Sequence, residues 1–327
     1  TGSAITGVGA ALPSQRLTSQ ELEESLSLDE GWIRTRTGID SRHIAGPAET
    51  TCTLGTAAAA AALRAADLRA ADVDYLIVAT VTPDFRLPAA ASMLGASLGC
   101  NAPAFDLNAG CSGFLCGLAQ ADALVRSGAA GNVLVVGAET LSRIVDFSDP
   151  KTGILFGDGA GAAVVAADDT SCIGPFVLHS DGSQPELLMA SHGGGKVVMA
   201  GRAVYTRAIH EMTLSVSEVA RAAGVSLDDV DLLVAHQANG RIIEAVAERL
   251  GLPPEKVFTN IARHGNTSAA SIPIALAEAQ AEGVLREGDL VVLAAFGAGF
   301  MWGAGVVRWG AAGTEPSPLA ERDLANV

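Results

Sequence analysis

Long hydrophobic runs are missing from this sequence. No segment approaches 18 consecutive apolar residues, and the chain does not open with a basic region followed by an apolar stretch. A transmembrane helix needs about 20 predominantly apolar residues, and a secretory signal needs both a basic and an apolar region. We therefore expect neither a membrane span nor a signal peptide, and we predict a cytoplasmic location.

Excess positive charge and paired cysteines are missing as well. The net charge of −15 opposes nonspecific binding to nucleic acids or membranes, so an anionic partner must meet a local basic patch. The five cysteines are odd in number and contain no CxxC pair, which argues against a disulfide framework or a zinc site. Residues 7–9 (GVG) lack the third glycine of a dinucleotide-binding loop. We expect reduced thiols and no metal site.

The composition is that of an ordinary globular protein. The 327 residues are 49% hydrophobic and 17% charged, enough for one large core or two medium ones. Strands and helices alternate, which predicts a layered α/β architecture with buried sheets. The clearest predicted strands are 4–8, 73–79 and 103–107, and the clearest predicted helices are 19–28, 53–68 and 114–127.

An internal repeat runs through the chain. Residues 72–78 (DVDYLIV) resemble residues 229–235 (DVDLLVA) at an offset of 157. Residues 131–136 (GNVLVV) resemble residues 288–293 (GDLVVL) at the same offset. A shared offset at separated places predicts two halves of one duplicated fold.

The repeat divides the chain. The offset of 157 carries Cys111 onto Ser268, which also precedes a predicted helix. We assign residues 1–168 to an N-terminal half and residues 169–310 to a C-terminal half, and we predict a frayed tail over residues 311–327. Within the second half, the glycine- and serine-rich stretch from 181 to 202 is predicted to be a long loop.

Cys111 lies at a predicted strand-to-helix elbow between Gly110 and Gly113. The glycines let the backbone turn sharply, and the unpaired N–H groups of the first helical turn lie near the sulfur. Together with the helix dipole they favour a thiolate, which predicts a lowered pKa and a nucleophile. A buried structural cysteine is the alternative, and the elbow alone leaves both open.

Two polar side chains follow predicted strands in the second half. His236 comes directly after the apolar run 232–235, and Asn266 lies in a loop before a helix. Ligands bind outside the carboxyl ends of strands in such sheets. Each residue alone is more often structural, the histidine in a core and the asparagine in a turn. Together with Cys111 they occupy three such elbows, so we predict one catalytic site.

Two further stretches suit ligand binding. Trp32 and Arg36 are close in sequence, and an arginine beside an indole can stack on a base and neutralise a phosphate, as a nucleotide tail requires. A surface helix end is the commoner explanation for such a pair. Residues 296–300 (FGAGF) predict a glycine-rich turn whose amides face an oxyanion.

Several long motifs in one order resemble β-ketoacyl-[acyl-carrier-protein] synthase III. They extend from about residue 1 to residue 310, so the resemblance covers nearly the whole chain. The motifs are 32–39 (WIRTRTGI), 110–114 (GCSGF), 156–162 (FGDGAGA), 236–239 (HQAN), 264–271 (HGNTSAAS) and 296–300 (FGAGF). The resemblance implies a thiolase-like fold of five layers, α-β-α-β-α, usually in a homodimer.

The resemblance also implies a Cys-His-Asn site made of Cys111, His236 and Asn266. Cys111 takes an acyl group from acyl-coenzyme A, and malonyl-carrier protein then loses carbon dioxide to give an enolate that attacks the acyl-enzyme. The backbone N–H groups of Cys111 and Ala298 hold the tetrahedral oxyanion. The product is a β-ketoacyl thioester, and no metal or redox cofactor is required.

Substrate positions follow from the same resemblance. Trp32 and Arg36 match the coenzyme A site, and Asn239 matches the residue that holds the pantetheine arm. Arg241 matches a position implicated in docking of the acyl carrier protein, which is typically acidic. Other arginines near it complete a candidate docking set, namely Arg249, Arg207 and Arg202. Such arginines are otherwise solvated helix faces.

Three positions depart from the bacterial fatty-acid enzyme. Gly110 replaces the usual alanine, and Leu87 replaces a phenylalanine that shapes the acyl pocket across the dimer. Both changes remove bulk, which predicts starters larger than acetyl, as in enzymes that prime polyketide synthases. Pro150 replaces an arginine that contacts coenzyme A, and the loop around residues 183–196 is shorter.

Two other functions fit part of the sequence. An acyltransferase of this fold would pass the acyl group to a hydroxyl, an amine or a carrier thiol without condensation. Asn266 disfavours it, because a carboxamide donor is most useful for enolate chemistry. A non-catalytic subunit would only bind the carrier protein, which the presence of Cys111, His236 and Asn266 opposes.

Overall fold

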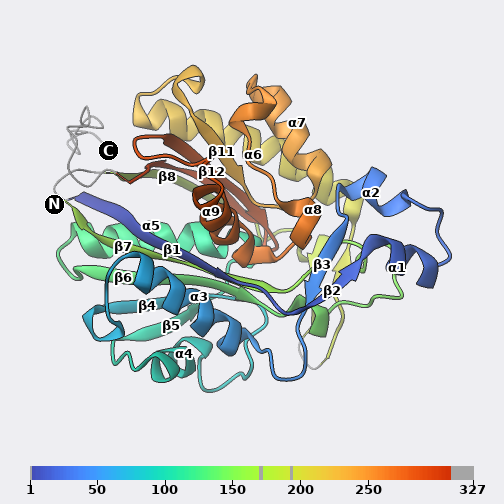
Figure 1. The fold of residues 1–327 in the computed structure, drawn as a ribbon. Coiled ribbons are helices and arrows are strands. Elements are labelled where there is room, and N and C mark those ends of the chain that lie inside the picture. Colours follow the sequence, from blue (N-terminus) through green and yellow to red (C-terminus); the bar gives the residue numbers. More distant parts are fainter. Residues whose placement is uncertain (1, 169–171, 192–193, 311–327) are drawn as a thin grey trace.

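Two β-sheets lie between three layers of helices (Figure 1). The computed structural model describes residues 2–168, 172–191 and 194–310, so the predicted tail, 311–327, lies outside the described residues. Separate apolar clusters join each sheet to an outer helix layer, and a third joins both sheets to the central layer. The predicted order of layers, α-β-α-β-α, is confirmed.

Each sheet combines parallel and antiparallel strands. The first sheet has the strand order β1 (Gly2–Ala11), β7 (Gly159–Asp168), β6 (Asn132–Glu139), β4 (Tyr75–Ala79) and β5 (Ala104–Leu107). The second sheet has the order β8 (Ile173–Ser180), β13 (Met301–Arg308), β12 (Leu290–Gly297) and β11 (Leu232–Ala235). Strand β4 is parallel to β5 and β6, and β11 is parallel to β12, whereas the other pairs are antiparallel.

The two sheets repeat one topology. The order β1-β7-β6-β4 matches β8-β13-β12-β11 in both sequence and direction. Val257 makes an isolated parallel bridge to Leu233 of β11, on the side where β5 pairs with β4. The division of the chain at residue 168 stays a prediction, since residues 169–171 lie outside the described ranges.

The register of the repeat changes between neighbouring strands. Tyr75 of β4 pairs with Val133 of β6, and Leu232 of β11 pairs with Val291 of β12. The offset is therefore 157 residues from β4 to β11 but 158 residues from β6 to β12. The second half has one extra residue between these two strands.

Two short 3₁₀ helices follow the same shift. Helix η2 (Gly110–Ser112) precedes α5 in the first half, and η7 (Ser268–Ala270) precedes α9 in the second, at an offset of 158. The predicted equivalence of Cys111 and Ser268 is therefore wrong by one residue. Ser268 is the counterpart of Gly110, and both have a left-handed backbone, with φ of 50° and 55°.

The helix layers have clear membership. The outer layer on the first sheet consists of α3 (Thr51–Ala65) and α4 (Ala90–Leu98), the central layer of α5 (Gly113–Arg126) and α9 (Ser271–Ala281), and the other outer layer of α6 (Gly201–Ala223) and α7 (Gly240–Leu250). No helix in the described ranges has the length and apolarity that a membrane crossing requires.

Smaller elements extend beyond the sheets. One group is β2 (Gln15–Thr18), α1 (Ser19–Ser25), α2 (Trp32–Thr37), β3 (Ser41–Ile44) and α8 (Ile261–His264). The predicted loop at 181–202 contains a short hairpin, made of β9 (Leu188–Met189) and β10 (Val198–Met199).

Strand β1 and helix α3 pack more closely than larger side chains allow. A Cβ added to Gly9 would lie 2.5 Å from the carbonyl oxygen of Ala58, and one added to Gly7 would lie 2.4 Å from that of Ala62. Ala58 and Ala62 are fully buried. The glycines near the N-terminus therefore serve packing against an alanine-rich helix.

Gly9→Ala tests this packing. The added methyl group meets backbone atoms that cannot move aside, so we expect a loss of about 1–3 kcal/mol in the free energy of unfolding. Urea denaturation followed by circular dichroism measures it. Gly182→Ala is the matched control, because its Cβ would have its nearest neighbour at 3.8 Å. Equal stability of both variants would contradict the packing argument.

Candidate active site

The predicted cysteine, histidine and asparagine line one cavity of about 1130 Å³. Cys111 lies in η2, His236 follows β11, and Asn266 lies between α8 and η7. Residues from the two halves of the chain therefore meet at one place. Ligand pockets for small molecules are usually about 300–1,000 Å³, so the cavity is large enough for an extended substrate.

Burial keeps the imidazole of His236 neutral. The side chain is 1% exposed, and burial lowers the pKa of His236 to about 3. Its Nδ1 lies 2.6 Å from the hydroxyl oxygen of Ser271, which in turn accepts a hydrogen bond from the backbone N–H of Gln237. This contact orients the ring and leaves Nε2 for the cavity.

The carboxamide of Asn266 is fixed through its oxygen. Oδ1 accepts a hydrogen bond of 2.9 Å from the backbone N–H of Ser268. The backbone of Asn266 is held to the turn at 155–157, donating to the Leu155 carbonyl and accepting from the Gly157 N–H. Because Oδ1 is engaged, the Nδ2 group is the one that can donate to a ligand.

The backbone at Cys111 packs directly against the glycine-rich turn at the end of β12. A Cβ added to Gly297 would lie 2.5 Å from the Cys111 nitrogen, and one added to Gly110 would lie 2.8 Å from the Ala298 nitrogen. The two N–H groups predicted to hold an oxyanion therefore belong to adjacent backbone segments at the cavity wall. Their role stays a prediction.

The environment of the Cys111 thiol differs from the sequence prediction. Burial raises the pKa of Cys111 to about 11; an interaction with Ser268 lowers it, and the charge of Glu139 raises it. The predicted lowering by the helix N-terminus is therefore wrong, because removal of the thiolate from water outweighs it. The thiol is protonated at neutral pH and must lose its proton as it reacts.

Trp32 and Arg36 form the stacked pair that the sequence suggests. The guanidinium carbon of Arg36 lies 4.0 Å from the centre of the Trp32 ring. Asn239 joins this pair to helix α7, since its Nδ2 donates to the Arg36 carbonyl and its Oδ1 caps the helix at the Arg241 N–H. Arg36, Asn239 and Arg241 line the same cavity as Cys111.

Family models match both halves of this site. The model described as 3-oxoacyl-[acyl-carrier-protein (ACP)] synthase III matches residues 105–182, and the model of its C-terminal part matches residues 220–309. A β-ketoacyl-[acyl-carrier-protein] synthase III of Roseiflexus sp. (strain RS-1) is 46% identical and covers 94% of this chain and 98% of the relative. The chain belongs to this family. It is therefore a condensing enzyme of the acyltransferase class.

Solved structures of β-ketoacyl synthases confirm the thiolase-like fold. The 3-oxoacyl-[acyl-carrier-protein] synthase III of Aquifex aeolicus VF5 has a TM-score of 0.92 and 46% identity, covering 94% of this chain and all of its own. The priming β-ketosynthase of the R1128 polyketide pathway has a TM-score of 0.91 and 35% identity, covering 94% and 96%.

Of the two departures predicted to enlarge the acyl pocket, Gly110 does not have that effect, and the effect of Leu87 across a dimer stays a prediction. Gly110 does not enlarge the pocket, since its missing Cβ would meet the backbone of Ala298. Leu87 is 87% exposed in the single chain and does not line the cavity, whereas Phe85 and Arg86 do. Within one subunit, Gly110 therefore adds no room for larger starters, and the predicted preference for them stays a prediction.

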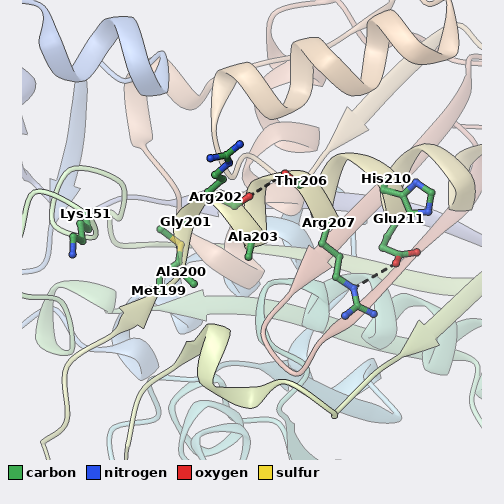
Figure 2. Close-up of a pocket in the computed structure, with 10 residues that line it drawn as sticks. All are labelled: Lys151, Met199, Ala200, Gly201, Arg202, Ala203, Thr206, Arg207, His210 and Glu211. Carbon is green, nitrogen blue, oxygen red and sulfur yellow. Dashed lines mark hydrogen bonds and ion pairs between the residues drawn. The ribbon is translucent and has the colours of Figure 1, made fainter.

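Arg207 is engaged within the protein. It is ion-paired with Asp181 at 2.5 Å and with Glu211 at 3.5 Å, the pair drawn in Figure 2, and lies over the rings of Phe300 and Trp302. These contacts give Arg207 a structural role, so we remove it from the candidate docking set. Arg241 and Arg249 are exposed on α7.

A groove beside the start of α6 contains further cations. It has a volume of about 930 Å³, and Lys151 and Arg202 lie on its walls (Figure 2). Both residues also line the main cavity, so the groove adjoins its mouth. Lys151 directly follows Pro150, so a cation lies one residue beyond the position where the resemblance predicts the loss of an arginine.

The sequence reasoning missed three residues around the site. Ser271 orients His236, and Glu139 and Ser268 act on the pKa of Cys111. Glu139 ends a strand, and both serines belong to the motif that carries Asn266. Glu139 could have been identified by its position at a strand end, and the two serines by their position in the motif.

Ser271→Ala tests the orientation of His236. Without the hydroxyl, Nδ1 loses its partner and the ring is free to turn, so we expect kcat to fall on the order of 10- to 100-fold with little change in KM. Steady-state kinetics of condensation measure both. Ser215→Ala, which removes a buried hydroxyl without a hydrogen-bond partner in the described structure, is the control. An unchanged kcat in Ser271→Ala would contradict this role.

Proposed function

We propose that this enzyme joins an acyl group from acyl-coenzyme A to malonyl-carrier protein and releases a β-ketoacyl-carrier protein. One observation carries the proposal: Cys111, His236 and Asn266 line a single cavity whose wall includes Arg36, which stacks on Trp32. A chain of this family with that arrangement has a nucleophile, two neutral hydrogen-bond donors and a site for a nucleotide tail.

In the first step the Cys111 sulfur attacks the acyl thioester. Exchange of one thioester for another is nearly balanced in energy, and it stores the acyl group on the enzyme. The tetrahedral oxyanion is held by the backbone N–H groups of Cys111 and Ala298. Coenzyme A binds with its nucleotide end at Trp32 and Arg36 and its pantetheine arm near Asn239.

In the second step malonyl-carrier protein loses carbon dioxide. The enolate oxygen that forms accepts hydrogen bonds from His236 Nε2 and Asn266 Nδ2. A neutral His236 suits this task, because its pKa of about 3 keeps it uncharged at neutral pH. The enolate carbon then attacks the acyl-enzyme and expels the Cys111 thiolate. Neither step requires a metal or redox cofactor.

Carrier protein docks through cations at the cavity mouth. Arg241 and Arg249 are exposed on α7, and Lys151 and Arg202 are exposed beside it. The chain as a whole is acidic, so an acidic carrier protein is attracted only where cations gather. The predicted cytoplasmic location stays a prediction.

A homodimer fits the exposed apolar residues of the single chain. Phe85, Leu87 and Phe105 are 55%, 87% and 39% exposed. Phe105 lies in β5, which forms one edge of the first sheet. Exposed apolar side chains beside a sheet edge are unfavourable in water, and a second copy would cover them.

The acyltransferase and carrier-binding alternatives differ from condensation in measurable products. Acyl transfer without condensation leaves malonyl-carrier protein intact, whereas condensation releases one carbon dioxide for each product. A subunit that only binds carrier protein takes up no acyl label on Cys111. The intact cavity with all three side chains favours condensation.

Asn266→Ala tests the condensation. Loss of one enolate donor is expected to slow decarboxylative condensation about 10²–10³-fold. Acylation of Cys111 by acyl-coenzyme A, followed by intact-protein mass spectrometry, should change by no more than a few fold. Asn101→Ala, at an exposed position, is the control. Equal losses in both steps, or none in condensation, would argue against the assigned role.

Arg249→Glu tests carrier docking. Reversing this charge should raise KM for malonyl-carrier protein on the order of 10-fold, and added salt should shrink the difference from wild type. The acylation rate with acyl-coenzyme A should stay unchanged. Arg64→Glu, on α3 of the other sheet, is the control. If both variants behave alike, α7 does not receive the carrier.

A further inference from the structure

Glu139 is a buried carboxyl group that the mechanism above does not use. It ends strand β6 and is 0% exposed. Its carboxyl oxygens accept hydrogen bonds from the Thr82 hydroxyl at 2.5 Å, the Thr80 hydroxyl at 3.2 Å and the Val81 N–H at 3.1 Å. The Thr80 and Thr82 hydroxyls accept from backbone N–H groups, so their own protons are directed to Glu139.

Ser268 links this carboxyl group to the nucleophile. Ser268 and Cys111 line the same cavity, and the 3₁₀ helices η7 and η2 that carry them pack against each other. The Ser268 side chain lowers the pKa of both Cys111 and Glu139. The end of β6 packs tightly on η7, since a Cβ added to Gly137 would lie 2.3 Å from the carbonyl oxygen of Ala269. This close approach of strand and 3₁₀ helix brings the end of β6, where Glu139 lies, against η7, whose first residue, Ser268, lines the cavity with Cys111.

The backbone of Ser268 has a left-handed conformation, with φ of 50°. A residue with a Cβ is strained there by on the order of 1 kcal/mol, whereas glycine is not. Its counterpart in the first half, Gly110, has φ of 55° and is a glycine. The second half therefore keeps a hydroxyl at a position where the same fold elsewhere uses glycine, which points to a function for the hydroxyl.

The proposed reaction removes a proton from Cys111 and later returns one to it. When the acyl group is loaded, the S–H bond of Cys111 breaks, and coenzyme A leaves as a thiolate that takes a proton from water. When the carbon–carbon bond forms, the C–S bond breaks and Cys111 leaves as a thiolate that must regain a proton. His236 is a weak base, because burial lowers its pKa.

We propose that Glu139 stores the Cys111 proton, and that the Ser268 hydroxyl relays it. During acylation, Cys111 gives its proton to Ser268 while Ser268 gives its own to the Glu139 carboxylate. During condensation the transfers reverse and restore the Cys111 thiol. The proposal rests on the proposed role of Cys111. In this relay Ser268 exchanges a proton with the reacting sulfur, and Glu139 acts through Ser268.

The environment of Glu139 suits both directions of transfer. Burial raises the pKa of Glu139 to about 7, while the hydrogen bonds from Thr82, Val81, Ser268 and Thr80 lower it. Both protonation states are therefore populated near neutral pH. The side chains that form hydrogen bonds with Glu139 carry hydroxyl groups, which are uncharged. Cys111 is the titratable group whose pKa is raised by the charge of Glu139.

Glu139→Gln separates a proton store from a purely structural role. Glutamine keeps the shape but cannot exchange the proton, so condensation by pre-acylated enzyme should slow on the order of 10- to 100-fold and lose its dependence on a group titrating near pH 7. Alkylation of Cys111 by iodoacetamide should instead be faster than wild type at pH 8 and equal to it at pH 6, because the variant lacks the carboxylate charge that raises the pKa of Cys111.

Condensation within twofold of wild type, or identical alkylation profiles at both pH values, would overturn the proposal. So would a parallel loss of condensation and alkylation, which indicates damage to the site.

Ser268→Gly gives a second test that does not depend on folding of the first variant. Glycine relieves the strained backbone, so thermal stability should be equal or higher while condensation slows about 10-fold or more. Ser268→Ala should show the same kinetic loss without the gain in stability. Wild-type condensation in Ser268→Gly would overturn the relay. Absence of an acyl group on wild-type Cys111 after exposure to acyl-coenzyme A would instead overturn the proposed function.

Discussion

Burial of reactive polar groups between two sheets is the constraint on which this site depends. Removal from water raises the pKa of Cys111, lowers that of His236 and raises that of Glu139. Each shift favours the neutral form, so the Cys111 thiol and the His236 imidazole are uncharged at neutral pH, and the Glu139 carboxyl group is only partly ionised. Charge develops only as the reaction proceeds, where fixed donors such as the Asn266 carboxamide can stabilise it.

Duplication explains how these groups meet. Equivalent strands end at a shared seam, and η2 and η7 pass close to each other there. The halves differ in what they place at equivalent positions: Gly110 in one is Ser268 in the other, although both have a left-handed backbone. In the proposed mechanism, this divergence lets one half supply the nucleophile while the other supplies the hydrogen-bond donors.

The cavity mouth has a different character from its floor. Although the protein as a whole is acidic, three cations line the cavity, namely Arg36, Arg241 and Lys151. The Trp32 ring, which stacks on Arg36, adds an aromatic face. Arg207 shows why a cation close in sequence is not always a docking residue. Its guanidinium is ion-paired with two carboxylates of its own chain. Glu211 lies four residues along the same helix, whereas Asp181 comes from a separate segment that only the tertiary structure brings close.

The sequence by itself determined the layered fold, the repeat and the elbow residues Cys111, His236 and Asn266, because periodicity, glycine placement and long motifs are local signals. Only the tertiary structure decided the one-residue shift of the repeat, the raised pKa of the thiol, the exposure of Leu87 and the place of Glu139. Each of these properties depends on contacts between segments that are far apart in the sequence. Such contacts determine which groups are removed from water and how closely atoms pack, and they exist only in the folded chain.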